Sequence, residues 1–177
     1  MAVQPDYQIT FQNQLIQAKV GVIVNVLEDH MDVMGPTLDE VAQAFTATIP
    51  YDGHLVTIEG PYLEYYKKIA AERNTKVIVA DNDKVSEEYL REFDYMVFPD
   101  NASIGLAVAE ALGIDAETAM RGMLNAQPDP GAMRITTFGD EKNPAFLVNG
   151  FAANDASSTL RIWERVDSMN YSEKLPI

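Results

Sequence analysis

The sequence contains no cysteine. This absence excludes disulfide bridges and thiolate metal sites, so any bound metal ion would need oxygen or imidazole ligands. The sequence also lacks an apolar run of the roughly 20 residues that cross a bilayer, and its first residues carry neither a basic segment nor an apolar signal core. We therefore expect a soluble chain, with the cytoplasm as its default compartment.

Basic residues are scarce, with 13 lysines and arginines against 27 aspartates and glutamates and a formal net charge of −14. Such an excess of negative charge repels phosphate backbones and anionic membrane surfaces, so nucleic acid is not an expected partner. The chain is nevertheless 47% hydrophobic over 177 residues, which is enough to bury a core and predicts a globular protein.

Apolar, β-branched runs alternate with helical patterns along the chain, and this alternation predicts an α/β fold with a mostly parallel sheet. The expected strands are 20–24, 54–59, 75–80 and 95–98, and the expected helices are 5–18, 37–48, 61–74, 86–92, 101–112 and 115–124. In the first helix, Ile9, Leu15 and Ile16 have the spacing of one buried face. Thr37 and Glu40 have the spacing of a capping box, which starts a helix.

Turn-forming residues concentrate at 125–131 and predict a domain boundary there. We assign residues 1–127 to one domain and residues 128–177 to a linker and the start of a second α/β domain. The second part is expected to hold strands at 134–138 and 145–148 around a turn, followed by a helix at 156–166 with Leu160 and Trp163 on one side.

A polar segment follows the first expected strand and contains Asn25, Asp29, His30 and Asp32. Open α/β sheets bind ligands at the carboxyl ends of their strands, so this position favours a functional site. An imidazole beside two carboxylates suits Mg²⁺ or Mn²⁺ in a phosphate-handling centre. The alternative is a turn network in which these side chains bind only the loop backbone.

Two asparagines stand at predicted helix starts. Asn101, after Asp100, and Asn154, before Asp155, each have the position of a helix N-cap. The Asn101 amide has a second interpretation, because it can bind an adenine edge where a nucleotide site adjoins it.

Four stretches of the chain carry a resemblance. VGVIVNVLEDHMDVMGPTLDE resembles the strand and N-x-x-x-D-H-x-D loop of the Mur ligase superfamily, which includes muramyl peptide ligases and folylpolyglutamate synthases. PDNASIGLAVAEALGID is similar to its alanine-rich helix, and DPGAMRI and NGFAANDASSTL are similar to segments of its third domain. Within the superfamily, the chain most resembles the ATP-dependent ligase subunits of bacterial poly-γ-glutamate (capsule) synthases. The resemblance implies the back half of a Rossmann-like ATPase domain, followed by the start of a C-terminal ligase domain.

The resemblance also implies roles for the residues of the polar segment. His30 matches the histidine that holds a magnesium ion near the transferred phosphate, and Asp29 matches its catalytic neighbour. Asn25 matches a residue that shapes the loop, and Asp32 matches a supporting residue. In the nucleotide site, Asn101 matches an asparagine near the adenine, and Asn154 matches one that closes over the nucleotide.

The chain departs from the superfamily in several places. Residues 38–50 contain no lysine, although many members carry a carbamylated, metal-binding lysine there. Ala132 replaces the arginine after Pro-Gly, with Arg134 as a possible substitute, and Ala153 and Asn149 replace the usual histidine and aspartate. No G-x-x-x-x-G-K-[ST] phosphate loop occurs. In the superfamily that loop and a metal-binding glutamate lie upstream, so the resemblance implies an internal fragment with half an active site.

The implied function is ATP-dependent amide ligation, in which a terminal carboxylate becomes an acyl phosphate and the amine of a glutamate attacks it. The implied cofactors are ATP and Mg²⁺, or Mn²⁺. The implied partners are glutamate, the poly-γ-glutamate chain, small membrane subunits and the missing upstream half, which would place the protein at the inner face of the membrane.

Three alternatives stay open at this point. The chain could belong to another Mur-type ligase that acts on muramyl peptide or folate. It could be a catalytically silent module that binds a nucleotide or a metal ion. It could also be a scaffold whose acidic face serves assembly.

Overall fold

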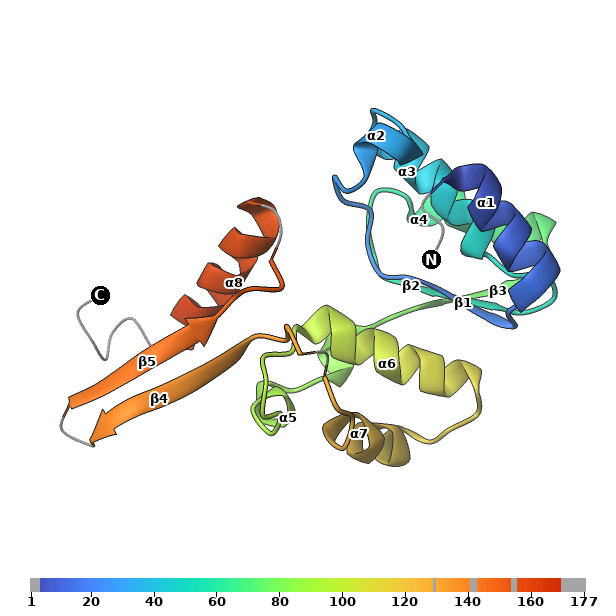
Figure 1. Ribbon diagram of the computed structural model, residues 1–177. Helices are drawn as coiled ribbons and strands as arrows, with labels where there is room; N and C mark the ends of the chain where they lie inside the picture. The colour runs from blue at the N-terminus through green and yellow to red at the C-terminus, as the bar shows by residue number, and fades with distance from the viewer. Residues whose placement is uncertain (1–3, 129, 141–142, 154–155, 170–177) are drawn as a thin grey trace. The chain divides into compact units, whose positions relative to one another are not determined.

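The computed structural model describes residues 4–128, 130–140, 143–153 and 156–169 (Figure 1). The chain forms two compact units, one made of residues 1–86 and 98–124 and the other of residues 87–97 and 125–177. The domain assignment made from the sequence differs because it places residues 87–97 in the first part, and it stays a prediction.

The first unit contains a parallel sheet of three strands, β1 (Val20–Ile23), β2 (His54–Thr57) and β3 (Lys76–Val79), in that order. Leu55 and Val56, neighbours on β2, are both completely buried. Successive side chains of a strand point to opposite faces, so both faces of the sheet are covered. The predicted α/β fold with a parallel sheet is confirmed.

Helices α3 (Leu38–Phe45) and α4 (Leu63–Glu72) cover one face of this sheet (Figure 1). Their shared core consists of Ile23, Ala42, Ile49, Leu55, Tyr66 and Ala70. The predicted capping box at the start of α3 is confirmed, because the Thr37 hydroxyl accepts from the Glu40 N–H and the Glu40 carboxylate accepts from the Thr37 N–H. Both bonds satisfy backbone donors that the first turn of a helix leaves free.

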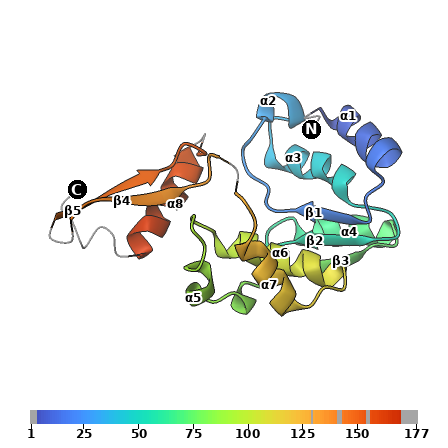
Figure 2. The same ribbon diagram turned by 60° about the horizontal axis from the view of Figure 1, so that its bottom comes forward.

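The opposite face of the sheet is covered by α6 (Pro99–Ala111), with α7 (Ala116–Leu124) packed next to α6 (Figure 2). The buried residues on this side are Val56, Ile78, Ile104 and Ala107. Gly113, at φ +72°, stops α6 as predicted. The next helix has the predicted cap, in which Asp115 Oδ1 accepts from the Thr118 N–H at 2.9 Å. This hydrogen bond lowers the pKa of the Asp115 carboxyl.

The N-terminal helix differs from its prediction. It comprises α1 (Pro5–Thr10) and a π-helical continuation, η1 (Phe11–Ile16). The expected buried face of Ile9, Leu15 and Ile16 is wrong, because all three side chains are exposed. The helix turns Gln8 and Gln12 toward the protein instead, where both are partly buried. Periodicity identified the helix, but the rest of the unit decided which side faces inward.

The expected strand at residues 95–98 is also wrong. Met96 donates its N–H to the Met133 carbonyl at 2.8 Å, and no strand is assigned to these four residues. Pro99 immediately begins α6 and has no N–H to offer a sheet, so the run is too short for a ladder. Tyr95 packs instead edge to face on Phe93, with ring centroids 5.5 Å apart.

The second unit contains the predicted hairpin and helix. Strands β4 (Arg134–Asp140) and β5 (Asn143–Asn149) pair antiparallel, and α8 runs from Ala156 to Ser168. Leu160 and Trp163 are exposed, whereas Val166 is the buried side chain of α8. The short helix α5 (Glu87–Leu90) also belongs to this unit.

An ion pair joins α8 to α5 within the second unit. Arg165 Nη1 and Nη2 each lie 2.9 Å from a separate carboxylate oxygen of Glu87. The Arg165 side chain is 12% exposed and that of Glu87 is 49% exposed. The bond to Arg165 lowers the pKa of Glu87 below its ordinary value of 4.5.

We expect the substitution Glu87→Gln to lower the free energy of unfolding by about 1 kcal/mol at neutral pH, a value reduced for the exposure of Glu87. The Arg165 guanidinium would keep its charge and lose its anionic partner. Because the pKa of Glu87 is lower in the folded state, its contribution is complete above the ordinary carboxyl pKa and is lost as the pH falls through the folded value. The difference in urea midpoint between wild type and Glu87→Gln should therefore be largest at pH 7 and shrink steadily as the pH is lowered below the ordinary carboxyl pKa.

The matched control is Glu64→Gln, which breaks the exposed Lys67–Glu64 pair on α4. It should leave the urea midpoint almost unchanged. A difference between wild type and Glu87→Gln that does not change as the pH is lowered would contradict the role of the Glu87 charge.

Candidate functional site

The carboxyl ends of the three parallel strands lie at one edge of the sheet in the first unit. The segment after β1 leads through Asn25 and His30 into α2 (Met31–Met34). The segment after β3 forms the short helix η3 (Asn82–Lys84), which contacts α6. This edge is where the sequence predicts a ligand site.

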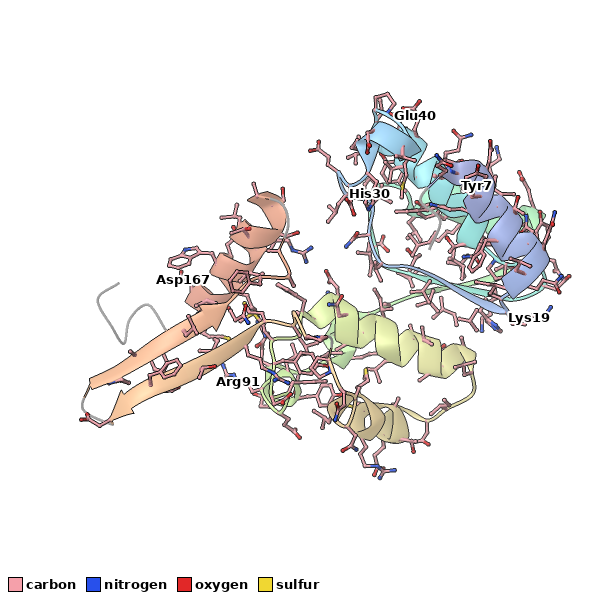
Figure 3. All side chains as sticks on the ribbon, viewed as in Figure 1. Tyr7, Lys19, His30, Glu40, Arg91 and Asp167 are labelled. Atoms are coloured by element: carbon pink, nitrogen blue, oxygen red, sulfur yellow. The ribbon has the colours of Figure 1, made fainter. Side chains whose placement is uncertain are left out.

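His30 occupies a special backbone position at this edge. Its φ of +49° is in the left-handed region, and its carbonyl oxygen accepts from the N–H groups of Val33 and Met34, each at 2.9 Å. Figure 3 shows His30 on the loop between β1 and α2. Gly35 ends α2 at φ +133°, and a Cβ there would collide with the Glu40 side chain. The loop therefore runs directly into the capping box of α3.

The structure brings together two of the four predicted loop side chains. His30 Nε2 lies 3.6 Å from Asp29 Oδ1, and the His30 side chain is 52% exposed. Asp32, in the first turn of α2, and Asn25 are both exposed. Within the part of the chain that the structure describes, no three histidine, aspartate or glutamate side chains group closely enough to hold a metal ion. The expected cluster of one imidazole and two carboxylates is therefore not formed by Asp29, His30 and Asp32.

One imidazole and one nearby carboxylate, both open to solvent, fit a metal ion that takes its other ligands from elsewhere. Mg²⁺ usually keeps several waters and is bound by one or two protein groups together with substrate phosphates. Asp29 and His30 are therefore compatible with such an ion as a partial ligand set.

A small apolar pocket adjoins the start of the loop. Its volume is about 230 Å³, and it lies between β1 and the N-terminal helix. Its lining includes Phe11, Val22, Val24, Asn25 and Phe45. The Asn25 amide is thus placed between an apolar pocket and the polar loop.

A hydrogen-bonded network that the sequence did not reveal joins η3 to the start of α6. Ser103 Oγ donates to Asn82 Oδ1 at 2.6 Å, and Asn82 Nδ2 donates to Asp100 Oδ1 at 2.7 Å. Ser103 is 1% exposed, and its hydroxyl has two acceptors in reach, Asn82 Oδ1 and the Asp100 carbonyl oxygen at 3.0 Å. Turn-forming residues at 81–83 are a local signal for a turn, but the side-chain partners of Asn82 lie 18 and 21 residues further along the chain.

Asn101 lies beside this network in the first turn of α6. Its side chain is exposed, and its N–H is bonded to the Phe98 carbonyl at 3.0 Å. The N-cap position belongs to Phe98, with Pro99 as the first helical residue, so the N-cap interpretation of Asn101 is wrong. Asn154 lies outside the described residues, so the structure does not place it.

Comparison with known proteins adds a second line of information. The family model described as the poly-gamma-glutamate synthase CapB C-terminal domain matches residues 135–177. The capsule biosynthesis protein CapB of Bacillus anthracis is 80% identical over all 177 residues, which make up 38% of that relative. The PGA synthase CapB of Bacillus subtilis (strain 168) is 68% identical over the same 177 residues, which make up 45% of its length.

The chain belongs to the CapB family. It spans less than half the length of the two curated CapB relatives that it matches. The first unit, with the polar loop after β1, is part of the region that both of them share with this chain.

The fold of this CapB-family chain has a counterpart among solved structures. The crystal structure of MurF from Acinetobacter baumannii matches 89% of the chain and 39% of MurF, with a TM-score of 0.67 and 15% identity. At this identity the match shows the fold alone, and it confirms the Mur-ligase-type α/β fold. Within the described residues, no helix is both long and apolar enough to cross a membrane.

Proposed function

We propose that this chain is the part of a CapB ligase that supplies one side of the active site for ATP-dependent amide synthesis. One observation carries the proposal. The chain is 80% identical to CapB of Bacillus anthracis in an alignment that spans all 177 residues and so includes the polar loop. The reaction joins glutamate units through γ-amide bonds. It is consistent with the name PGA synthase, which one of the relatives carries.

The proposed reaction has two steps. An oxygen of the terminal carboxylate attacks the γ-phosphorus of ATP, so that an acyl phosphate forms and ADP leaves. The amine of the incoming glutamate then attacks the acyl carbon, which forms the amide and releases phosphate and a proton. Both the carboxylate and the triphosphate are anionic, so their approach must be compensated by positive charge. Mg²⁺, or Mn²⁺, would supply that charge when bound.

In this proposal, His30 and Asp29 face the reacting phosphate from the loop after β1. The His30 backbone, fixed by two hydrogen bonds to its carbonyl, holds the imidazole at the carboxyl edge of the sheet. By the resemblance, Asn25 and Asp32 would shape and support the loop, on which both side chains are exposed. Such positioning is what phosphoryl transfer requires, because the protein contributes mainly orientation and electrostatics.

The nucleotide would extend from this loop toward α6. Asn101, exposed in the first turn of α6, would face the adenine, and the Asn82–Asp100–Ser103 network would hold that turn in place. Asn154 lies outside the described residues, and its proposed role at the nucleotide rests on the family resemblance alone. The phosphate loop would come from the part of CapB that this chain does not contain, so we expect the chain alone to be inactive.

The proposed partners follow from this chemistry. They are glutamate, the growing poly-γ-glutamate chain, the remaining part of the CapB polypeptide and small membrane subunits of the synthase. Those subunits would hold the ligase at the inner face of the membrane.

The proposal can be tested with a chimera in which this chain replaces the matched region of B. subtilis CapB. We expect release of ADP that depends on Mg²⁺ and on glutamate or a short γ-glutamyl acceptor, together with acceptors lengthened by γ-linked glutamate in mass spectra. The 177-residue chain alone should release none. ADP release that responds to a muramyl peptide or to a folate, and not to glutamate, would refute the proposed substrate.

A further inference from the structure

Strand β5 ends in an asparagine that is followed directly by a glycine, Asn149 and Gly150. This is the only Asn-Gly pair among the ten asparagines of the sequence. Asparagine side chains readily contact the backbone that follows them, and a glycine leaves its own backbone nitrogen unobstructed because it has no Cβ. The pair is therefore the place in this chain where an asparagine side chain is best able to react with the next peptide group.

The structure holds the Asn149 side chain against this backbone. Asn149 Oδ1 accepts a hydrogen bond from the Phe151 N–H at 3.2 Å, which closes a turn around Gly150. When a nucleophile attacks the side-chain carbonyl carbon, negative charge develops on Oδ1, and a backbone N–H in this position stabilises it as in an oxyanion hole. Phe151 is 93% exposed, and Asn149 and Gly150 are both half-buried, so water reaches the turn.

The fold does not require a glycine at position 150. Gly150 has no positive φ, and among the described residues the nearest atom to a Cβ built there is Ile162 Cδ1, at 4.0 Å. Gly35 differs, because its φ is +133° and a Cβ there would collide with the Glu40 side chain. An alanine at position 150 would thus change the reactivity of the pair and leave the packing intact.

We propose that Asn149 is a site of spontaneous deamidation in the folded protein. The Gly150 backbone nitrogen loses its proton and attacks Asn149 Cγ, and ammonia leaves as a cyclic succinimide closes. Water then adds to one of the two ring carbonyls and breaks its bond to the ring nitrogen. Opening at one carbonyl gives aspartate, and opening at the other gives isoaspartate. The net change consumes one water and releases one ammonia, and it requires no other reactant.

The modification changes both charge and backbone at the end of β5. Asn149 lies opposite Arg134 in the hairpin, so a carboxylate at position 149 would lie on the same face as the guanidinium that pairs with Asp94 at 3.3 Å. The isoaspartate form also adds a carbon to the main chain, which would disturb the hydrogen bond from the Phe151 N–H. The inference rests on none of the ligation chemistry, and its test measures mass, so its failure can be told apart from a failure of the proposed function.

Peptide mass spectrometry of the full-length chimera with B. subtilis CapB tests the proposal. The folded chimera is incubated at mildly alkaline pH, which favours loss of the amide proton, and the same peptide from Asn149→Asp serves as the standard for the aspartate product. We expect the Asn149 peptide to gain the mass of deamidation before any other asparagine of the matched region. Part of the product should elute apart from the standard, as isoaspartate. An Asn149 peptide that keeps its amide while other asparagines lose theirs would overturn the proposal.

Gly150→Ala is the matched variant, because the added methyl group hinders attack by the backbone nitrogen and has room in the fold. We expect its melting temperature to equal that of wild type and its deamidation at Asn149 to fall to the level of the other asparagines. Unchanged deamidation at Asn149 in this variant would overturn the proposed route through the succinimide.

A second comparison measures what the fold contributes. Wild type is incubated at the same pH in the folded state and unfolded in guanidinium chloride. Because the Phe151 N–H is held on Asn149 Oδ1 only in the folded state, we expect the folded protein to deamidate at least as fast as the unfolded chain. A clearly slower reaction in the folded protein would show that the fold protects the pair, and it would overturn the proposal.

Discussion

Replacement of His30 by asparagine in the full-length chimera is expected to lower glutamate-dependent ADP release by at least about 100-fold. Asparagine is the informative substitution because His30 has a φ of +49°, a conformation that asparagine adopts more readily than alanine. The variant thus removes the imidazole and keeps the loop. If His30 contributes to holding the metal ion, the Mg²⁺ concentration for half-maximal activity should rise as well.

The control for this experiment is His54→Asn, which replaces the second of the two histidines. His54 begins β2 and therefore lies at the amino end of the strand, away from the candidate site. It should retain activity within about twofold. The melting temperature of His30→Asn should equal that of wild type, because the side chain is largely exposed. Full activity in His30→Asn would show that the loop side chains only brace the backbone.

The largest expected effect on stability is that of Gly21→Ala, in the middle of β1. A Cβ at this position would collide with the backbone carbonyl oxygen of Thr48 and would lie 3.0 Å from Pro50 Cδ. Neither neighbour is the flexible end of a side chain, so the backbone around η2 (Thr46–Thr48) would have to move away from the sheet. We expect a loss of about 2 to 3 kcal/mol in the free energy of unfolding, measured by urea denaturation.

Gly60→Ala is the matched control, because a Cβ at Gly60 meets no atom within 4 Å and Gly60 has no positive φ. Its free energy of unfolding should stay within about 0.5 kcal/mol of wild type, or rise slightly through the lower entropy of the unfolded chain. An equal loss in both variants would contradict the assignment of the effect to the close approach of Thr48, because a Cβ at Gly60 meets no neighbour.

Some features could be predicted because their physical cause lies within a few residues. Apolar β-branched runs identified β1, β2 and β3, since both faces of a parallel sheet must be buried. The Thr37–Glu40 capping box and the Gly113 stop depend on hydrogen bonds and backbone angles of neighbouring residues. The polar loop after β1 followed from the same logic, because the carboxyl end of a strand is recognisable from the strand itself.

Other features depend on partners that are distant in sequence. The Asn82–Asp100–Ser103 network joins residues 18 and 21 positions apart, so no local pattern identified Asn82. His30 pairs with Asp29 and not with Asp32. This choice depends on the left-handed backbone at His30, which the amino-acid types in the loop do not specify.

The amino-acid sequence by itself determined the family, the parallel sheet and the position of the candidate loop, because periodicity, capping and strand ends are local. Only the tertiary structure decided which side of the N-terminal helix faces inward and which residues meet around the start of α6. The physical reason is that burial is a property of the whole packed unit: Gln8 faces inward and Leu15 faces outward because of the surface on which the helix packs.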